Sequence, residues 1–77
     1  MTEKTIHTKN DITELQNYIE GYGFGISVEK LVAKAYNHME ANGHEVIILN
    51  DRYLVVNGTT YLFSKSRKHG RWIAKAL

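Results

Sequence analysis

The chain has 77 residues, carries a formal net charge of +2, and contains no cysteine. A chain of this length is expected to form one small domain, in which a deep catalytic pocket has little room. Disulfide bonds and thiolate metal sites are excluded, so stability must come from tight turns, helix caps or a partner chain.

No apolar signal segment is visible near the N-terminus, and no apolar run approaches the ~20 residues that span a bilayer. We therefore expect a cytoplasmic protein with no membrane partner. Residues 1–10 are polar and unpatterned, and they are predicted to form a flexible N-terminal tail. Residues 11–77 are predicted to form a single α+β domain.

The first predicted helix begins at Asp11, because Asp11 and Glu14 have the spacing of a capping box. Apolar residues then recur on one face until Gly21 ends the helix. The glycine-rich segment 21–25 follows. A phosphate-binding loop is not indicated there, because such a loop follows a buried strand. The segment is instead predicted to be a turn that places Tyr22 and Phe24 in the core, or alternatively an exposed contact loop.

The second predicted helix begins after Ser27, which is a good N-cap, and ends at Asn42-Gly43, a left-handed cap. Its apolar stripe is Val28, Leu31, Val32, Ala35, Tyr36 and Met39. Its outward face carries mixed charge. A DNA-recognition helix should instead carry arginine, lysine or amide side chains, so a helix-turn-helix reader is not favoured.

The strongest local signal is Asn57-Gly58, which separates two β-rich runs. A type I′ turn needs positive φ at both central residues, and this pair tolerates that best. Asn50-Asp51 is predicted to be a second two-residue turn, and Arg67–Gly70 a longer loop. The predicted strands are residues 45–49, 52–56, 59–63 and 71–77. The expected fold class is α+β, with two N-terminal helices packed on one face of a four-stranded antiparallel β-meander (ααββββ).

These turns predict a register in which Leu54 pairs with Tyr61, Lys65 with Trp72, and Ile48 with Tyr53. One face of the sheet then holds Val46, Ile48, Tyr53, Val55, Leu62, Ile73 and Leu77. The other holds Ile47, Leu49, Arg52, Leu54, Val56, Tyr61, Phe63, Lys65, Trp72 and Ala74. Two short helices can cover only one face. We expect them to cover the first, which leaves the second as a partner surface. Alternatively, the faces are reversed and the aromatic residues form the core.

Charge is distributed unevenly along the chain. From Thr59 onward every charged residue is basic, whereas eight acidic and five basic residues precede it. The basic residues of this last part are Lys65, Arg67, Lys68, Arg71 and Lys75. Such an asymmetry favours a polyanionic or acidic partner, although lysines that merely keep a hairpin soluble would give the same pattern.

The basic loop Lys65–Trp72 resembles the glycine-turned hairpins of three-stranded-sheet DNA readers such as integrase arm-binding domains. The resemblance covers this loop alone, and the order of elements differs, since helices come first here. A hairpin of this composition can lie along phosphates or enter a groove as a β-ribbon.

The first functional hypothesis is a small non-enzymatic regulatory protein that binds DNA or RNA. Aromatic rings beside cations on an open sheet suit single-stranded nucleic acid, because bases stack on the rings while the cations contact phosphates. The candidate binding residues are Arg52, Tyr61, Phe63, Lys65, Arg67, Lys68, His69, Arg71, Trp72 and Lys75. The second hypothesis is a protein-binding inhibitor or regulator, for example of phage type, that uses the open sheet face on an acidic partner or in a homodimer.

No catalytic residue, cofactor or metal site is expected. No residues form a nucleophile–base–orienter set. His38, Glu40 and His44 are close in sequence, but they lie on either side of a helix end, so a metal site is not predicted.

Overall fold

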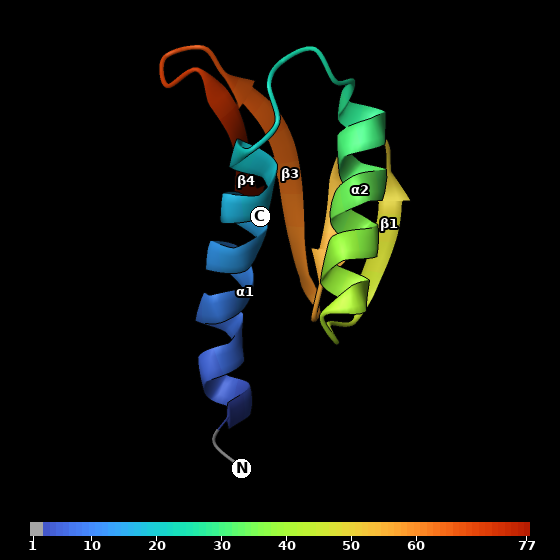
Figure 1. The fold of residues 1–77 in the computed structure, drawn as a ribbon. Coiled ribbons are helices and arrows are strands. Elements are labelled where there is room, and N and C mark those ends of the chain that lie inside the picture. The colour runs from blue at the N-terminus through green and yellow to red at the C-terminus, as the bar shows by residue number, and fades with distance from the viewer. Residues whose placement is uncertain (1–2) are drawn as a thin grey trace.

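The computed structural model describes residues 3–77, and side chains from residue 12 onward. The elements are α1 Glu3–Glu20, α2 Val28–Ala41, β1 Val46–Asn50, β2 Tyr53–Val56, β3 Thr59–Ser66 and β4 Arg71–Ala76. The strands form one antiparallel sheet in the order β1-β2-β3-β4. Both helices pack on the same face, with α1 against β4 and α2 against β1 and β2 (Figure 1). The predicted α+β fold with two helices and a four-stranded meander is confirmed.

The predicted start of the first helix was wrong. Helix α1 begins at Glu3, so Asp11 lies within the helix and cannot be its N-cap. The segment 3–10 therefore continues the helix, although residues 1–2 and the side chains before residue 12 lie outside the described part. The helix ends at Glu20, directly before the glycine that was predicted to stop it. A polar sequence with no apolar periodicity can still propagate a helix that packing has nucleated elsewhere, because propagation fixes fewer dihedrals than nucleation.

Helix α2 has the predicted caps, and the β2–β3 turn has the predicted conformation. The Ser27 side chain accepts a hydrogen bond from the backbone N–H of Lys30, as an N-cap should. At the other end Gly43 has a φ of 88°, the left-handed conformation that glycine adopts without strain. In the β2–β3 turn Asn57 and Gly58 have φ values of 49° and 88°, as a type I′ turn requires.

The predicted register is correct for three strands and wrong for the first. Leu54 lies opposite Tyr61, and Lys65 lies opposite Trp72, as the turns predicted. The turn consists of Asp51 and Arg52, so the predicted turn at Asn50-Asp51 was wrong, and Asn50 lies opposite Tyr53. The ladder then shifts between Ile48 and Asn50, which places Ile48 opposite Leu54. A bulge of this kind adds one residue to a strand, which moves each of its side chains to the other face.

The assignment of the two faces was also wrong. The helices cover the face that was predicted to be open. The core consists of Leu15, Ile19, Leu31, Val32, Ala35, Met39, Leu54, Val56, Tyr61, Phe63, Trp72 and Ala74. The reason is area, since aromatic side chains remove the most apolar surface from water and two helices can shield only one face. Tyr22 is half-buried against this core, and Phe24 remains 36% exposed, so the prediction for that segment holds for Tyr22 only.

Trp72 connects the helical layer to the sheet. Its side chain is 1% exposed, and its indole Nε1–H donates to the backbone oxygen of Gly23 at 3.0 Å. The Phe24 ring meets the indole edge-on, with centroids 5.9 Å apart. The turn between the helices is therefore fixed over the start of β4, because a buried indole donor without a partner would be costly.

The side chain of Gln16 fastens α1 to the outer edge of β4. Its amide nitrogen donates to the backbone oxygen of Trp72, and its amide oxygen accepts from the N–H of Ala74, both at 2.9 Å. The carboxamide thereby satisfies two backbone groups on the side of β4 that faces away from β3. One side chain replaces part of a neighbouring strand on what would be an open sheet edge.

Replacement of Gln16 by Leu should lower the free energy of unfolding by about 1–3 kcal/mol, because it leaves these two part-buried backbone groups without their partners. Urea denaturation followed by Trp72 fluorescence measures the change. The matched control is Asn17→Leu, on the exposed neighbouring position of the same helix. Equal urea midpoints for the two variants would contradict the role of Gln16.

Candidate nucleic-acid interface

The structure divides the ten predicted binding residues into a buried group and an exposed group. Tyr61, Phe63 and Trp72 are each 1% exposed and belong to the core. Their predicted role as stacking surfaces for bases was wrong, because a ring sealed beneath helices offers no face to a partner. The exposed group is Arg52, Lys65, Arg67, Lys68, His69, Arg71 and Lys75.

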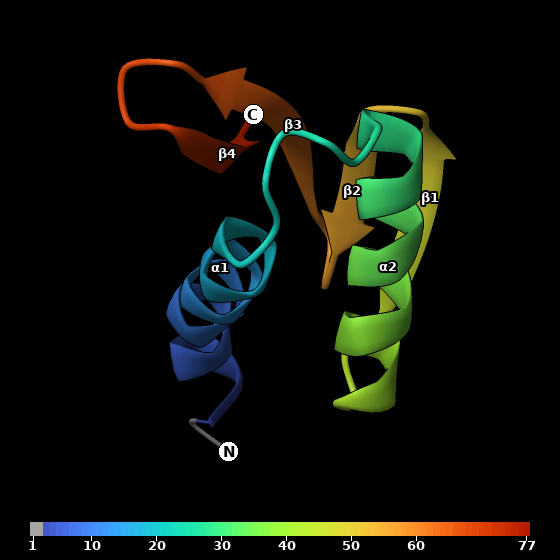
Figure 2. The same ribbon diagram turned by 45° about the horizontal axis from the view of Figure 1, so that its top comes forward.

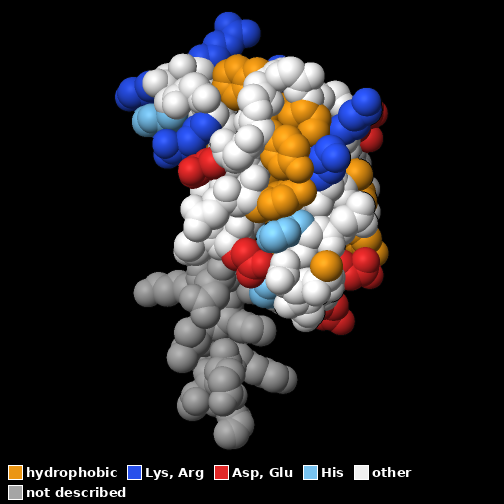
Figure 3. Space-filling model, viewed as in Figure 1, with side chains coloured by type: hydrophobic (Ala, Val, Ile, Leu, Met, Phe, Trp, Pro, Cys, Tyr) orange, Lys and Arg blue, Asp and Glu red, His pale blue; other side chains and the backbone are white. Residues whose placement is uncertain are grey.

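The hairpin tip, defined as Arg67–Gly70, carries three of these side chains at the turn between β3 and β4. Gly70 has a φ of 67°, and the backbone N–H of His69 donates to the Ser66 hydroxyl at 3.3 Å. The end of this hairpin extends away from both helices (Figure 2). Lys and Arg side chains gather around it in the space-filling view (Figure 3). The tip is therefore accessible to a large partner.

Arg52 and Lys65 lie behind the tip, on the helix-covered face but beyond the edge of the core. Arg52 lies opposite Phe63, whose N–H donates to the Arg52 backbone oxygen at 2.9 Å. The Lys65 ammonium lies 5.5 Å from the ring centroids of both Phe24 and Trp72. Cation–π attraction holds Lys65 near the rings and leaves its charge available to an anion.

Arg71 and Lys75 lie on the opposite face of β4 and differ in position. Arg71 is beside the tip, and its Nε lies 3.5 Å from the Glu20 carboxylate at the end of α1. Lys75 pairs with Leu62, four positions along the strand, which is about 13 Å away. The structure therefore brings six predicted residues to one end of the molecule and leaves Lys75 apart.

Two further cations belong to this end and were missed from the sequence. Lys30 and Lys34 are exposed in the first half of α2, whose N-terminus lies at the same end as the hairpin tip. Lys and Arg side chains lie over this part of α2 in Figure 3. The sequence showed them only as part of a mixed-charge helix face, and no local signal gives the direction in which a helix packs.

We call this surface the basic end. Its basic side chains are Lys30, Lys34, Arg52, Lys65, Arg67, Lys68 and Arg71, and its acidic ones are Glu20, Glu29 and Asp51. Among the described residues, Glu20 with Arg71 is the ion pair found at this end. The excess of positive charge is therefore not neutralised internally, and it creates a positive potential at the end where the hairpin projects.

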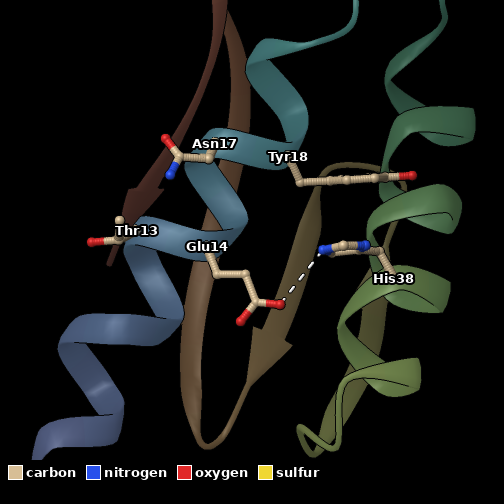
Figure 4. Close-up of a pocket in the computed structure, with 5 residues that line it drawn as sticks. All are labelled: Thr13, Glu14, Asn17, Tyr18 and His38. Carbon is tan, nitrogen blue, oxygen red and sulfur yellow. Dashed lines mark ion pairs between the residues drawn. The ribbon is translucent and has the colours of Figure 1, made fainter.

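A polar groove of about 550 Å³ lies between the helices and is lined by Thr13, Glu14, Asn17, Tyr18 and His38 (Figure 4). Glu14 places one carboxylate oxygen 2.9 Å from His44 Nε2 and the other 3.5 Å from His38 Nε2. The carboxylate thus joins α1 to the end of α2, with a negative charge that disfavours a polyanion. No group of His, Asp and Glu side chains in the described residues is arranged to hold a metal ion.

Tyr18 closes this groove and has an altered proton affinity. Its ring stacks on His38, with centroids 4.1 Å apart, and its hydroxyl lies 2.9 Å from the Tyr22 hydroxyl. Burial, and then the hydrogen bond and charge interaction with Tyr22, raise the pKa of Tyr18 from 10.0 to about 12. Each effect favours the neutral phenol.

The raised pKa of Tyr18 makes the fold sensitive to alkali. Above pH 10 the unfolded chain loses this proton while the folded chain keeps it, so stability present below pH 10 is lost as pH rises toward 12. Between pH 10 and 12, denaturant unfolding should show a smaller loss of unfolding free energy for Tyr18→Phe than for the native chain. Tyr53→Phe is the control, because Tyr53 lies on the other side of the sheet. Equal losses of unfolding free energy for the native chain and Tyr18→Phe would contradict this role of Tyr18.

Comparison of the chain with protein-family models, with curated proteins and with solved structures finds no match. Within the described residues, neither helix combines the length and the apolar character needed to cross a bilayer. Any functional conclusion must therefore come from the arrangement of the side chains.

Proposed function

We propose that this protein is a small non-enzymatic regulator that binds nucleic acid through its basic end. The observation that carries the proposal is the projecting hairpin tip, where Arg67 and Lys68 stand exposed with no carboxylate of the described residues in ion-pair distance. Flexible cations of this kind gain most from an extended array of phosphates, because each contact releases condensed counterions.

The binding mode differs from the one that the sequence favoured. With the aromatic rings in the core, base stacking cannot supply affinity, so phosphate contacts carry it. Phosphate contacts fix position but do not read sequence. We therefore expect weak dependence on base sequence and strong dependence on salt.

Charge polarity along the molecule supports an end-on approach. Glu14 and Glu45 lie at the end opposite the tip, near the β2–β3 turn. A polyanion is attracted to the basic end and repelled by the other, which orients the protein before contact.

Substitution of both Arg67 and Lys68 by Ala should weaken binding to every oligonucleotide sequence tested. Loss of two phosphate contacts should lower the slope of log affinity against log salt by about 2. Fluorescence anisotropy with a labelled duplex and a labelled single strand, between about 50 and 200 mM salt, measures both quantities.

The matched control is Lys75→Ala, which removes one exposed positive charge from a position away from the tip. It should reduce affinity much less than substitution at the tip does. If the native chain shows no binding to either oligonucleotide at low salt, the proposal fails. If Lys75→Ala weakens binding as much as the tip substitutions do, the interface is misplaced.

A specific observation favours a second candidate function, which is self-association. The uncovered face, defined as Ile47, Tyr53, Val55, Leu62 and Ile73, carries apolar side chains away from the helices. Ile47 is 56% exposed. A two-fold symmetric dimer would place this face against itself, and a mostly apolar surface is self-complementary in a way that a charged one is not. Phosphates, by contrast, gain nothing from it.

Replacement of Ile47 by Lys should convert such a dimer into a monomer, because it places a charge within the apolar contact. Size-exclusion chromatography with light scattering at micromolar concentration measures the mass. Ile48→Lys is the matched control, since Ile48 is the next residue and points to the helix-covered face. A monomeric native chain would rule out this candidate and leave nucleic-acid binding unaffected.

A further inference from the structure

Strand β1 is an edge of the sheet, and its side chains are exposed on both faces at once. Helix α2 lies over it and β2 lies beside it, with no further strand of the described chain beyond it (Figures 1 and 2). Ile47 points to the uncovered face and is 56% exposed. Ile48 lies opposite the buried Leu54 on the helix-covered side, yet it is 44% exposed. A strand with one covered face is exposed on that face only where a neighbouring strand is missing.

The backbone of β1 presents unused hydrogen-bonding groups along this edge. The N–H of Asn57 donates to the Glu45 oxygen at 2.7 Å, so Glu45 lies at a hydrogen-bonded position of the β1–β2 ladder. Such positions alternate along an antiparallel ladder, which makes Ile47 the next one. The N–H and C=O groups of Val46 and Ile48 therefore point away from β2. We call these outward groups the β1 edge.

The β1 edge lacks the features that usually prevent pairing with another chain. Residues 46–50 contain no charged side chain, and the sequence contains no proline. The opposite edge of the sheet is different, because β4 carries Arg71 and Lys75 and the Gln16 side chain bonds to its backbone. Lysine, proline or a covering segment is the usual protection of an exposed edge. Only one of the two edges has it here.

We propose that the β1 edge pairs with the β1 edge of a second copy of this chain. In an antiparallel pair with Ile47 on the two-fold axis, Val46 of each copy exchanges both backbone hydrogen bonds with Ile48 of the other. Every group of the β1 edge then has a partner. The two Ile47 side chains meet on the uncovered face, and Val46 packs beside Ile48 on the helix-covered side.

Charge and strand geometry both favour this register. If Ile48 were on the axis, Glu45 would lie opposite Asp51 of the second copy, and like charges directly opposite one another are destabilising. With Ile47 on the axis, Glu45 lies opposite Leu49 instead. The ladder is irregular between Ile48 and Asn50, so the segment with regular outward groups is centred on Ile47.

This pair differs from a face-to-face dimer, in which the sheets stack and the β1 edge stays open. Here the two sheets join into one, and the uncovered faces of the two copies become continuous. The antiparallel arrangement places the two hairpin tips at opposite ends, where both remain accessible. The inference therefore does not depend on the proposed nucleic-acid binding.

Amide hydrogen exchange of the native chain tests the backbone pairing. At about 0.5 mM we expect a dimer by sedimentation that dissociates on dilution, because contact along one short strand is small. Exchange of the Val46 and Ile48 amides should slow about tenfold once nine-tenths of the copies are paired, since exchange occurs from the unpaired fraction. The Ile47 amide is the internal control, because it faces β2 in monomer and dimer alike.

A single introduced cysteine tests the register, because the chain has none of its own. Across the axis the Cα atoms of Ile47→Cys would lie about 4.5 Å apart, within the range of a disulfide. Under mild oxidation this variant should form a covalent dimer. Val55→Cys is the matched control, on the same face but one strand further in. Its two copies would lie about 14 Å apart, so it should remain a monomer in denaturing electrophoresis.

The outcomes separate a second copy from other occupants of the β1 edge. A monomer at about 0.5 mM with unchanged exchange of Val46 and Ile48 overturns the proposal, as would be found if the edge receives an extended segment of another protein. Equal crosslinking of Ile47→Cys and Val55→Cys also overturns it, because the contact would then be face to face. Binding of oligonucleotides to the hairpin tip is measured separately, so neither result decides the proposed function.

Discussion

Burial of one indole organises this molecule. Trp72 packs beneath the helices, and its donor is satisfied by Gly23 in the turn that joins them. This contact fixes the turn between the helices over β4 and holds Phe24 edge-on against the indole. A domain of this size has few such contacts, so a large aromatic side chain contributes a substantial share of its apolar burial. The hairpin tip can project into solvent because its base is anchored in the core.

The features that depend on neighbouring residues could be predicted from the sequence. The conformation of Asn57-Gly58, the cap at Ser27 and the pairing of Leu54 with Tyr61 follow from local geometry. The register of β1 could not be predicted, because the ladder shifts between Ile48 and Asn50 and a bulge of this kind has no local sequence pattern that marks it. The choice of face was ambiguous for a physical reason. Both faces were apolar, and only the greater area of the aromatic residues decided between them.

The residues of the candidate site likewise divide into those that the sequence predicts and those that it does not. That the last part of the chain is basic is evident from composition, and the structure places Arg67 and Lys68 where that charge is accessible. That Arg52 and Lys65 share a hollow with the start of α2 depends on three elements meeting, and no sequence pattern reports it. The sequence predicts the aromatic residues at the partner-binding surface, because aromatics beside cations are typical of nucleic-acid binding. In a small domain the same residues are needed for the core.

The contact between Gln16 and β4 has a consequence for assembly. A sheet with two exposed edges can pair with another chain at each edge and grow into a fibre. A sheet with one blocked edge can pair with another chain only once. Here the Gln16 carboxamide occupies backbone groups of Trp72 and Ala74 on one margin, and β1 with its apolar residues forms the other. If two copies join through β1, each blocks further addition at its far side, so the product ends as a closed pair. In such a pair, a side chain of α1 would be what prevents a further strand from adding to β4, although the two are distant in sequence.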